Sequence, residues 1–164
     1  MKELMYVRPS YETRGDGGVR QFADAHRGIR MAVAIAEVLE LPFTLVSRAR
    51  DAIERLENSG DEDHRFTPSE VAALAEIVEL VARSLDSALD EDNRPRGELG
   101  TLIRQEAEKP TEGDFDRVFE LGEDGRVATI YPRMPIDAVQ ETLPVLADFM
   151  NHAAASGLPV DVVD

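Results

Sequence analysis

The sequence predicts an α+β fold that is mainly α-helical, with four or five packed helices and a small antiparallel β-hairpin or sheet. Apolar residues recur every three or four positions over several long segments, which is the period of an amphipathic helix. Between residues 115 and 131 the pattern changes, and two β-prone runs flank a turn that contains glycine. With 164 residues, 43% of them hydrophobic, the chain is long enough for a single domain with its own core over residues 1–164.

At the N-terminal end, residues 1–17 are predicted to form a strand at residues 4–7 and then a loop. Residues 18–108 are predicted to be helical, and the first helix is expected to begin near Val19 and to end at Leu41, before Pro42. Residues 31–41, from Met31 to Leu41, are apolar on nearly every side. Such a segment is typical of a helix that is central in its fold or packed in an oligomer.

Further helices are predicted over residues 43–58, 67–89 and 96–108. The second of these has the clearest start signal in the chain. Thr67 and Glu70 have the spacing of a capping box, with a proline at the first helical position. In the third helix two glycines weaken the helical pattern.

The predicted hairpin over residues 115–131 needs another element, because an isolated hairpin is marginally stable in water. Residues 5–7 and Val160–Val163 are the available strands, and we expect one of them to complete a small sheet. A C-terminal helix is predicted over residues 136–156. Pro144 lies inside it and should bend it or divide it into two segments.

The charge of the chain argues against some classes of binding partner. There are 18 Lys and Arg residues against 33 Asp and Glu residues, a formal net charge of −15. Because an acidic surface repels phosphate, we expect no direct binding of nucleic acid or of an anionic membrane. The absence of cysteine excludes disulfides and thiolate metal sites, and no apolar stretch reaches the length of a membrane span. A cytoplasmic protein without a cofactor is the simplest interpretation.

The acidic charge is distributed unevenly along the chain. Residues 1–34 carry a small excess of basic residues, whereas no Lys or Arg occurs from Pro135 onward. This asymmetry favours a protein partner with a basic surface. The carboxylates that we expect to meet such a partner are Asp114, Asp116, Glu120, Asp137, Glu141 and Asp148.

Four of the C-terminal polar residues invite a second interpretation. Asp137, Glu141, Asp148 and His152 are spaced by 4, 7 and 4 residues, so a helix places them on one stripe. Carboxylate and imidazole groups one turn apart can bind a metal in a helical core. The apolar residues of this segment, however, centre on the opposite side of the helix. We therefore predict that the stripe faces solvent.

A metal site elsewhere has weaker support. Asp61, Asp63 and His64 form a dense cluster, but neighbouring residues in one loop rarely converge on one ion. Residues 90–93 begin like a calcium-binding loop, but Arg94 and Arg96 stand where ligands should be. The chain also lacks the usual motifs of nucleophilic catalysis, so no catalytic residue can be named and an enzyme is not favoured.

These observations lead to one preferred function and two alternatives. The preferred hypothesis is an acidic, non-enzymatic protein-binding or regulatory domain, of the inhibitor, immunity or adaptor type, which meets a basic partner surface. The first alternative is a small metal-binding protein or hydrolase that uses carboxylates and histidine. The second is a homo-oligomeric structural protein, with a homodimer formed through the helix over residues 31–41.

Overall fold

The computed structural model describes residues 10–15, 18–59, 64–109, 117–131 and 133–163. Over these residues it has five helices and two antiparallel sheets, which confirms the predicted α+β fold with mainly helical content. The helices are α1 (Ala25–Val38), α2 (Phe43–Asn58), α3 (Pro68–Ala88), α4 (Gly97–Glu108) and α5 (Ile136–Ala155). The strands are β1 (Ser10–Gly15), β2 (Gly18–Phe22), β3 (Arg65–Phe66), β4 (Phe119–Leu121), β5 (Val127–Ile130), β6 (Met134–Pro135) and β7 (Val160–Val163).

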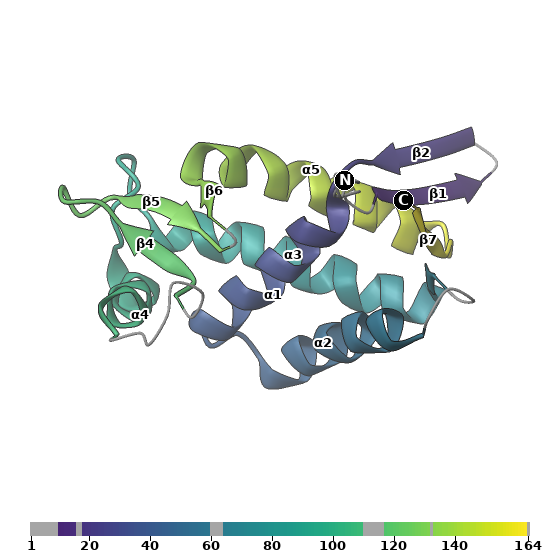
Figure 1. Ribbon diagram of the computed structural model, residues 1–164, viewed down its shortest axis with the longest axis horizontal. Helices are drawn as coiled ribbons and strands as arrows, with labels where there is room; N and C mark the ends of the chain where they lie inside the picture. Colours follow the sequence, from purple (N-terminus) through teal and green to yellow (C-terminus); the bar gives the residue numbers. More distant parts are fainter. Residues whose placement is uncertain (1–9, 16–17, 60–63, 110–116, 132, 164) are drawn as a thin grey trace, which may run out of the picture.

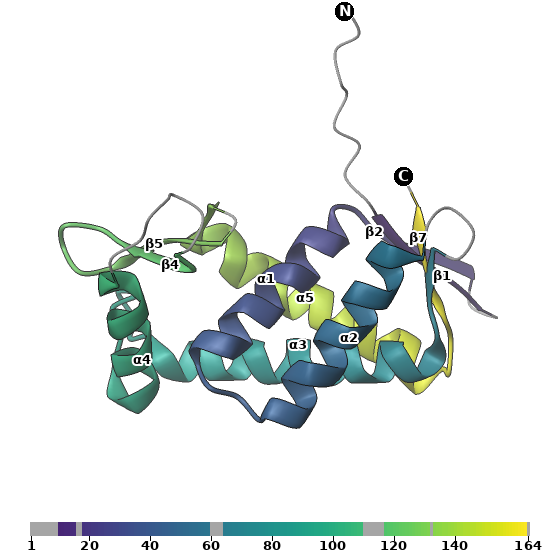
Figure 2. The same cartoon turned by 60° about the horizontal axis from the view of Figure 1, so that its bottom comes forward.

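The helix α3 is the centre of the fold, because α1, α2, α4 and α5 all pack against it. The two sheets lie at opposite ends of the molecule, with β1, β2 and β7 near the C-terminal end of α5 and with β4 and β5 beside α4 (Figure 1). On one side of α3, both α1 and α2 cover it (Figure 2). None of the helices in the described part of the chain combines the length and apolar character needed to cross a membrane.

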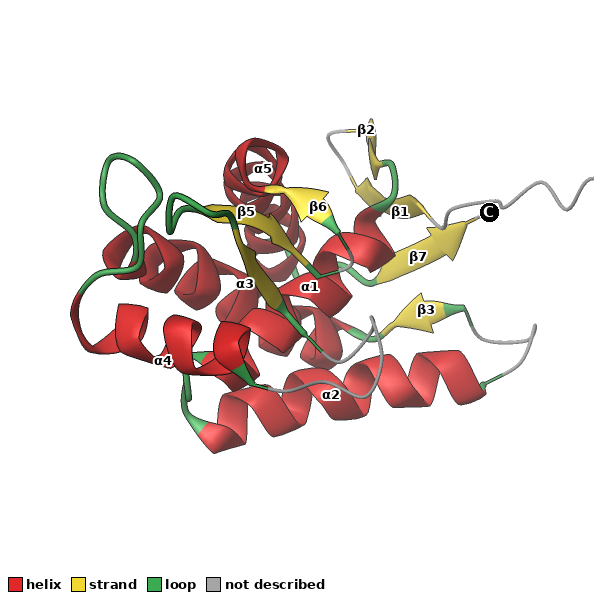
Figure 3. Ribbon diagram, turned by 60° about the vertical axis from the view of Figure 1, so that its left-hand side comes forward, coloured by secondary structure: helices red, strands yellow, loops and turns green. Residues whose placement is uncertain are grey.

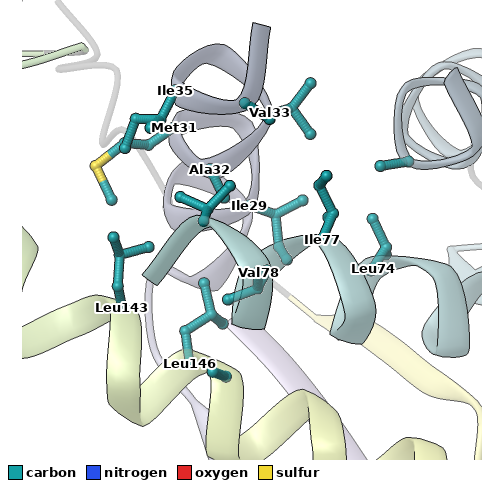
Figure 4. Close-up of a cluster of buried hydrophobic side chains, with 14 of the residues drawn as sticks. Ile29, Met31, Ala32, Val33, Ile35, Leu74, Ile77, Val78, Leu143 and Leu146 are labelled. Carbon is teal, nitrogen blue, oxygen red and sulfur yellow. The ribbon is translucent and has the colours of Figure 1, made fainter. Parts of the chain in front are cut away.

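The core forms where α1, α3 and α5 meet (Figure 4). Met31 and Ile35 of α1, and Leu39 directly after it, are at most 2% exposed in the single chain. The apolar character of residues 31–41 is therefore accounted for by packing inside the chain. A homodimer through this helix stays a prediction, and its apolar side chains are already covered without one.

The first sheet has the strand order β2-β1-β7-β3, and all its pairs are antiparallel. Here the predicted helix start near Val19 is wrong, because Gly18–Phe22 is the strand β2 and pairs with β1. Asp24 adopts a left-handed conformation with φ of 57°, which separates β2 from the start of α1 at Ala25. The helical spacing of α1 extends backwards by chance onto β2, where pairing with β1 decides the conformation.

The second sheet has the strand order β4-β5-β6, and the predicted hairpin is present as β4 and β5. The prediction that Val160–Val163 could complete this sheet is wrong. Met134–Pro135 pairs with β5, whereas Val160–Val163 pairs with β1 and β3. The 20 residues of α5 separate these two segments, and a helix of that length spans about 30 Å. Residues 5–7, the other expected strand, lie outside the described residues.

Of the remaining local predictions, the capping box is confirmed, whereas the loop predicted after residue 7 is wrong in part, because Ser10–Gly15 is the strand β1 and pairs with β2 and β7. The α3 capping box is formed, since the Glu70 backbone N–H donates to Thr67 Oγ1 at 3.2 Å and the Thr67 N–H donates to Glu70 Oε1 at 3.0 Å. The helix α5 continues through Pro144 and is not divided into two segments. No strand is predicted between residues 58 and 67, but the short strand β3 is present there and lies between β7 and α2 (Figure 3).

Candidate functional site

The exposed face of α5 carries three of the predicted partner-binding carboxylates. Asp137, Glu141 and Asp148 are all exposed. Leu143 and Leu146, on the other side of the helix, are buried against the core. The stripe predicted to face solvent does so, because the apolar residues of α5 recur at helical spacing and turn the acidic residues outward. We call these three residues the α5 acidic face.

The α5 acidic face is electrostatically isolated. Within the described residues, none of its three carboxylates forms a salt bridge. The arginines pair elsewhere, for example Arg30 with Glu57 between α1 and α2, and Arg55 with Glu70 between α2 and α3. The net negative charge of this face is therefore left for solvent ions or for a partner.

The other predicted partner-binding residues are placed differently. Glu120 lies on β4, where it accepts a hydrogen bond from the Thr129 hydroxyl at 3.3 Å. It belongs to a different element from the α5 acidic face. Asp114 and Asp116 lie outside the described residues, so their contribution stays a prediction.

The weaker metal candidates are not brought together by what the structure describes. His64 is exposed, and Asp61 and Asp63 lie outside the described residues. Across the described ranges, no three His, Asp or Glu side chains gather closely enough to hold a metal ion. A metal site at residues 61–64 stays a prediction.

The loop that begins like a calcium site closes on its own backbone. Asp90 Oδ1 accepts hydrogen bonds from the N–H groups of Arg94 at 2.9 Å and Asp92 at 2.8 Å. The Arg94 hydrogen bond is the main cause that lowers the pKa of Asp90. This carboxylate thus stabilises the turn between α3 and α4, and the local backbone occupies it in place of a cation.

Sequence reasoning missed a polar network that links three elements and runs from the buried Tyr11 to the exposed Glu57 and Arg30. The Tyr11 hydroxyl of β1 lies 2.8 Å from His26 Nδ1 of α1, and His26 Nε2 lies 3.1 Å from Glu57 Oε1 of α2. Arg30 Nη1 donates to the same Glu57 oxygen at 2.7 Å. A carboxylate can only accept, so a neutral His26 carries its proton on Nε2 and Tyr11 donates to Nδ1.

The order tyrosine, histidine, glutamate resembles an acid–base relay, but the burial of Tyr11 indicates a structural role. Tyr11 is 0% exposed, and its hydroxyl cannot reach a substrate. Burial raises its pKa well above the ordinary value, with a further increase from the charge of Glu57 and an opposing effect of Arg30. The opposite end of the network, Arg30 and Glu57, lines a cavity of about 300 Å³ between α1 and α2.

One sequence signal points toward this network. His26 and Arg30 are one helical turn apart and therefore share a face of α1. The burial of Tyr11 is known only from the structure, in which Tyr11 and Thr13 are the buried residues of β1. The missing information was the placement of Glu57, 31 residues after His26 in the chain.

Comparison with known proteins supplies no relative. The chain matches no model of a protein family, and no curated protein or solved structure matches it. The function must therefore be inferred from the residues themselves.

Proposed function

We propose that this protein is an acidic, non-enzymatic binding domain of the inhibitor, immunity or adaptor type, and that the α5 acidic face meets a basic surface of a partner protein. One observation carries the proposal: Asp137, Glu141 and Asp148 are exposed on one helix face, and none of them has a cationic partner among the described residues. Unpaired carboxylates along one face repel each other, and a basic partner relieves that repulsion.

The α5 acidic face is extended along the helix and lies beside an exposed apolar side chain. From Asp137 to Asp148 the stripe extends about 16 Å along the helix, at the usual rise of about 1.5 Å per residue. Val145, which is 57% exposed, lies between Glu141 and Asp148 along the helix, next to the exposed Pro144. An apolar contact ringed by charged groups is the usual composition of a protein interface. Complementary charge would act mainly on the association rate and on the choice of partner.

The test compares two triple variants that remove the same amount of charge from different helices. The first is Asp137→Asn, Glu141→Gln, Asp148→Asn on α5. The matched control, on the exposed side of α3, is Glu76→Gln, Glu79→Gln, Asp86→Asn. The full chain is immobilised, proteins of the source cell are captured, and the purified partner is then titrated against each variant at several salt concentrations.

A partner that binds the wild type and the α3 control, but binds the α5 variant at least about tenfold more weakly, supports the proposal. Its affinity for the wild type should fall as salt rises, because exposed charges are screened. Equal weakening by the two triple variants, or an affinity that is independent of salt, would contradict it.

A further inference from the structure

A second surface, at the β1–β2 hairpin, has a chemistry opposite to that of the α5 acidic face. Antiparallel pairing places Tyr11 opposite Phe22, Thr13 opposite Arg20 and Gly15 opposite Gly18. Because side chains alternate along a strand, these six residues share one face of the hairpin. Tyr11 is fully buried on this face, so it is turned toward the helices.

Along this inner face the side chains change from aromatic to small. The ring of Phe22 packs on that of Phe149 in α5, with centroids 5.9 Å apart. Beyond this contact, toward the hairpin turn, Thr13, Gly15 and Gly18 are too small to fill the same depth, and Arg20 is the one long side chain of this part of the face. The hairpin lies beside the C-terminal end of α5 and the start of β7 (Figure 1).

The result is a cavity of about 300 Å³ between the hairpin and the end of α5. Its lining residues are Thr13, Gly15, Gly18, Arg20, His152, Ser156 and Leu158. Gly15 and Leu158 approach closely on one wall, since a Cβ at position 15 would lie 3.0 Å from Cδ1 of Leu158. The volume is at the lower end of the range for small-molecule sites, so the cavity suits a small ligand.

The charge of the lining is unusual for a protein with a net charge of −15. Among the described residues of the lining, the two ionisable side chains, Arg20 and His152, are both of the basic type. Within the described residues neither of them forms a hydrogen bond or an ion pair. The two cavities lined by α2 residues, in contrast, have arginine and glutamate together in their walls.

Thr13 adds a hydrogen-bond donor to the wall of the cavity. The residue is 2% exposed and lines the cavity. Its hydroxyl forms no hydrogen bond with a described residue, and it is not among the fully buried polar atoms that lack a partner. The hydroxyl is therefore accessible from the cavity and can donate to an acceptor oxygen there.

The C-terminal end of α5 is the negative end of the helix dipole, but it repels an anion only weakly. The helix carbonyls of His152, Ala153 and Ala154 accept hydrogen bonds from the N–H groups of residues 156, 158 and 157. The residual negative end of a helix dipole has a smaller effect than one charge-assisted hydrogen bond from arginine. The attraction of an anion by Arg20 therefore outweighs its repulsion by the helix dipole.

We propose that this cavity binds a small anion through carboxylate or phosphate oxygens. Arg20 supplies the charge and a pair of donors, the Thr13 hydroxyl donates from the wall, and Ser156 and His152 complete the polar side of the site. Leu158 contacts the apolar part of the ligand. Arginine suits this role because its guanidinium donates two parallel hydrogen bonds to a carboxylate or a phosphate.

The test uses two probes, inorganic phosphate and succinate, each titrated into the ¹⁵N-labelled full chain while sodium chloride holds the ionic strength constant. Saturable shifts of the Thr13, Gly15, Gly18 and Arg20 amide signals with either probe support the site. Saturation by phosphate alone assigns a phosphoryl ligand, and saturation by succinate alone assigns a carboxylate. Failure of both probes to saturate these signals overturns the proposal.

Two variants and one matched control decide whether the cavity itself is responsible. Arg20→Gln should weaken binding by about tenfold or more, which is the effect of losing a charge-assisted hydrogen bond. Arg48→Gln is the control, because Arg48 is also exposed and has no partner among the described residues, but lines a different cavity. Equal weakening by the two arginine variants would overturn the site.

Thr13→Val tests the contribution of the hydroxyl. The variant should bind the probe more weakly, because a methyl group of the same shape cannot donate a hydrogen bond to the anion. Backbone amide spectra establish that the fold is kept. Unchanged binding by Thr13→Val would remove the hydroxyl from the site and contradict the proposal.

Discussion

The Tyr11 hydroxyl lies 2.8 Å from Nδ1 of His26, and this contact joins β1 to α1. Because His26 also contacts Glu57, the same imidazole connects both elements to α2. The ring of Tyr11 packs edge-on against Phe66 of β3, with ring centroids 5.5 Å apart. One tyrosine therefore combines apolar packing at the sheet with a polar link to two helices, and its hydroxyl should contribute measurably to stability.

Tyr11→Phe should lower the free energy of unfolding by about 1–2 kcal/mol. The substitution removes the hydroxyl and leaves His26 Nδ1 without its partner, while the aromatic packing is kept. Urea unfolding followed by circular dichroism measures the change. Tyr131→Phe is the control, since the hydroxyl of this partly exposed tyrosine forms no hydrogen bond with a described residue. Equal stability losses in the two variants would contradict a specific role of the Tyr11 hydroxyl.

Tyr11 should also make the protein sensitive to alkaline pH. Burial raises the pKa of Tyr11 well above the ordinary value of 10.0. Its neutral form is therefore favoured in the folded state, and this contribution is complete below pH 10.0 and is lost as the pH rises above that value. Melting temperatures measured across this range should fall more steeply for the wild type than for Tyr11→Phe. Parallel curves would show that another group causes the alkaline loss.

Thr67→Ala should cost about 1 kcal/mol of stability, the usual effect of losing an N-cap side chain. The Thr67 hydroxyl accepts a hydrogen bond from the Glu70 N–H, and this N–H has no partner within the helix. Ser69→Ala, two residues further on, is the control, because Ser69 is exposed and does not cap the helix. Chemical denaturation of both variants gives the comparison. A loss of the same size in Ser69→Ala would mean that the cap is not the cause.

Glu70 should make stability depend on acidic pH. Burial alone raises its pKa, but hydrogen bonds from Arg55 and Thr67 outweigh burial and lower the pKa below the ordinary value of 4.5. The charged form is therefore favoured on folding, so its contribution is present above pH 4.5 and is lost as the pH falls below it. In Glu70→Gln this part of the acid loss should be absent. Denaturation curves recorded at successively lower pH test it, and identical pH dependence in both proteins would refute the assignment.

The parts of the fold predictable from sequence are those decided within one element. The bounds of α2 and α4, the capping box of α3 and the outward turn of Asp137, Glu141 and Asp148 all follow from helical period and local hydrogen bonding. The strand β2 could not be predicted in this way, because its conformation depends on pairing with β1. The same reason explains why sequence alone does not place Val160–Val163 in the correct sheet.

The same distinction applies to the candidate sites: a site within one element can be predicted from sequence, and a site that joins distant elements cannot. The α5 acidic face was predictable because all its members lie on one helix. The Tyr11–His26–Glu57 network and the basic cavity at Arg20 were not, since each joins residues from elements distant in the chain. For the cavity the decisive fact is the register that places Thr13 opposite Arg20. The basic excess over residues 1–34 includes Arg20, but it does not show which residues face Arg20.

Gly100→Ala tests how closely α4 approaches the turn before it. In an exposed helix, replacing glycine by alanine stabilises a protein by about 1 kcal/mol. Here a Cβ would lie 2.6 Å from the carbonyl carbon of Pro95, closer than real Cβ atoms approach. Pro95 cannot easily move, because it bridges to Leu89 and its carbonyl accepts a hydrogen bond from Arg104 at 2.6 Å. We therefore expect a loss of about 1–3 kcal/mol, the usual cost of overpacking.

Gly28→Ala is the matched comparison for this prediction. Gly28 is also a buried helical glycine, but the nearest atom to an added Cβ would be Cδ2 of Leu146 at 2.9 Å, the far end of a flexible side chain. A leucine methyl can turn away at little cost, whereas the backbone of Pro95 cannot, so Gly28→Ala should be the less destabilising change. Urea unfolding ranks the two variants. If Gly100→Ala is as stable as the wild type, the contact with Pro95 does not constrain α4, and helix propensity alone decides the effect.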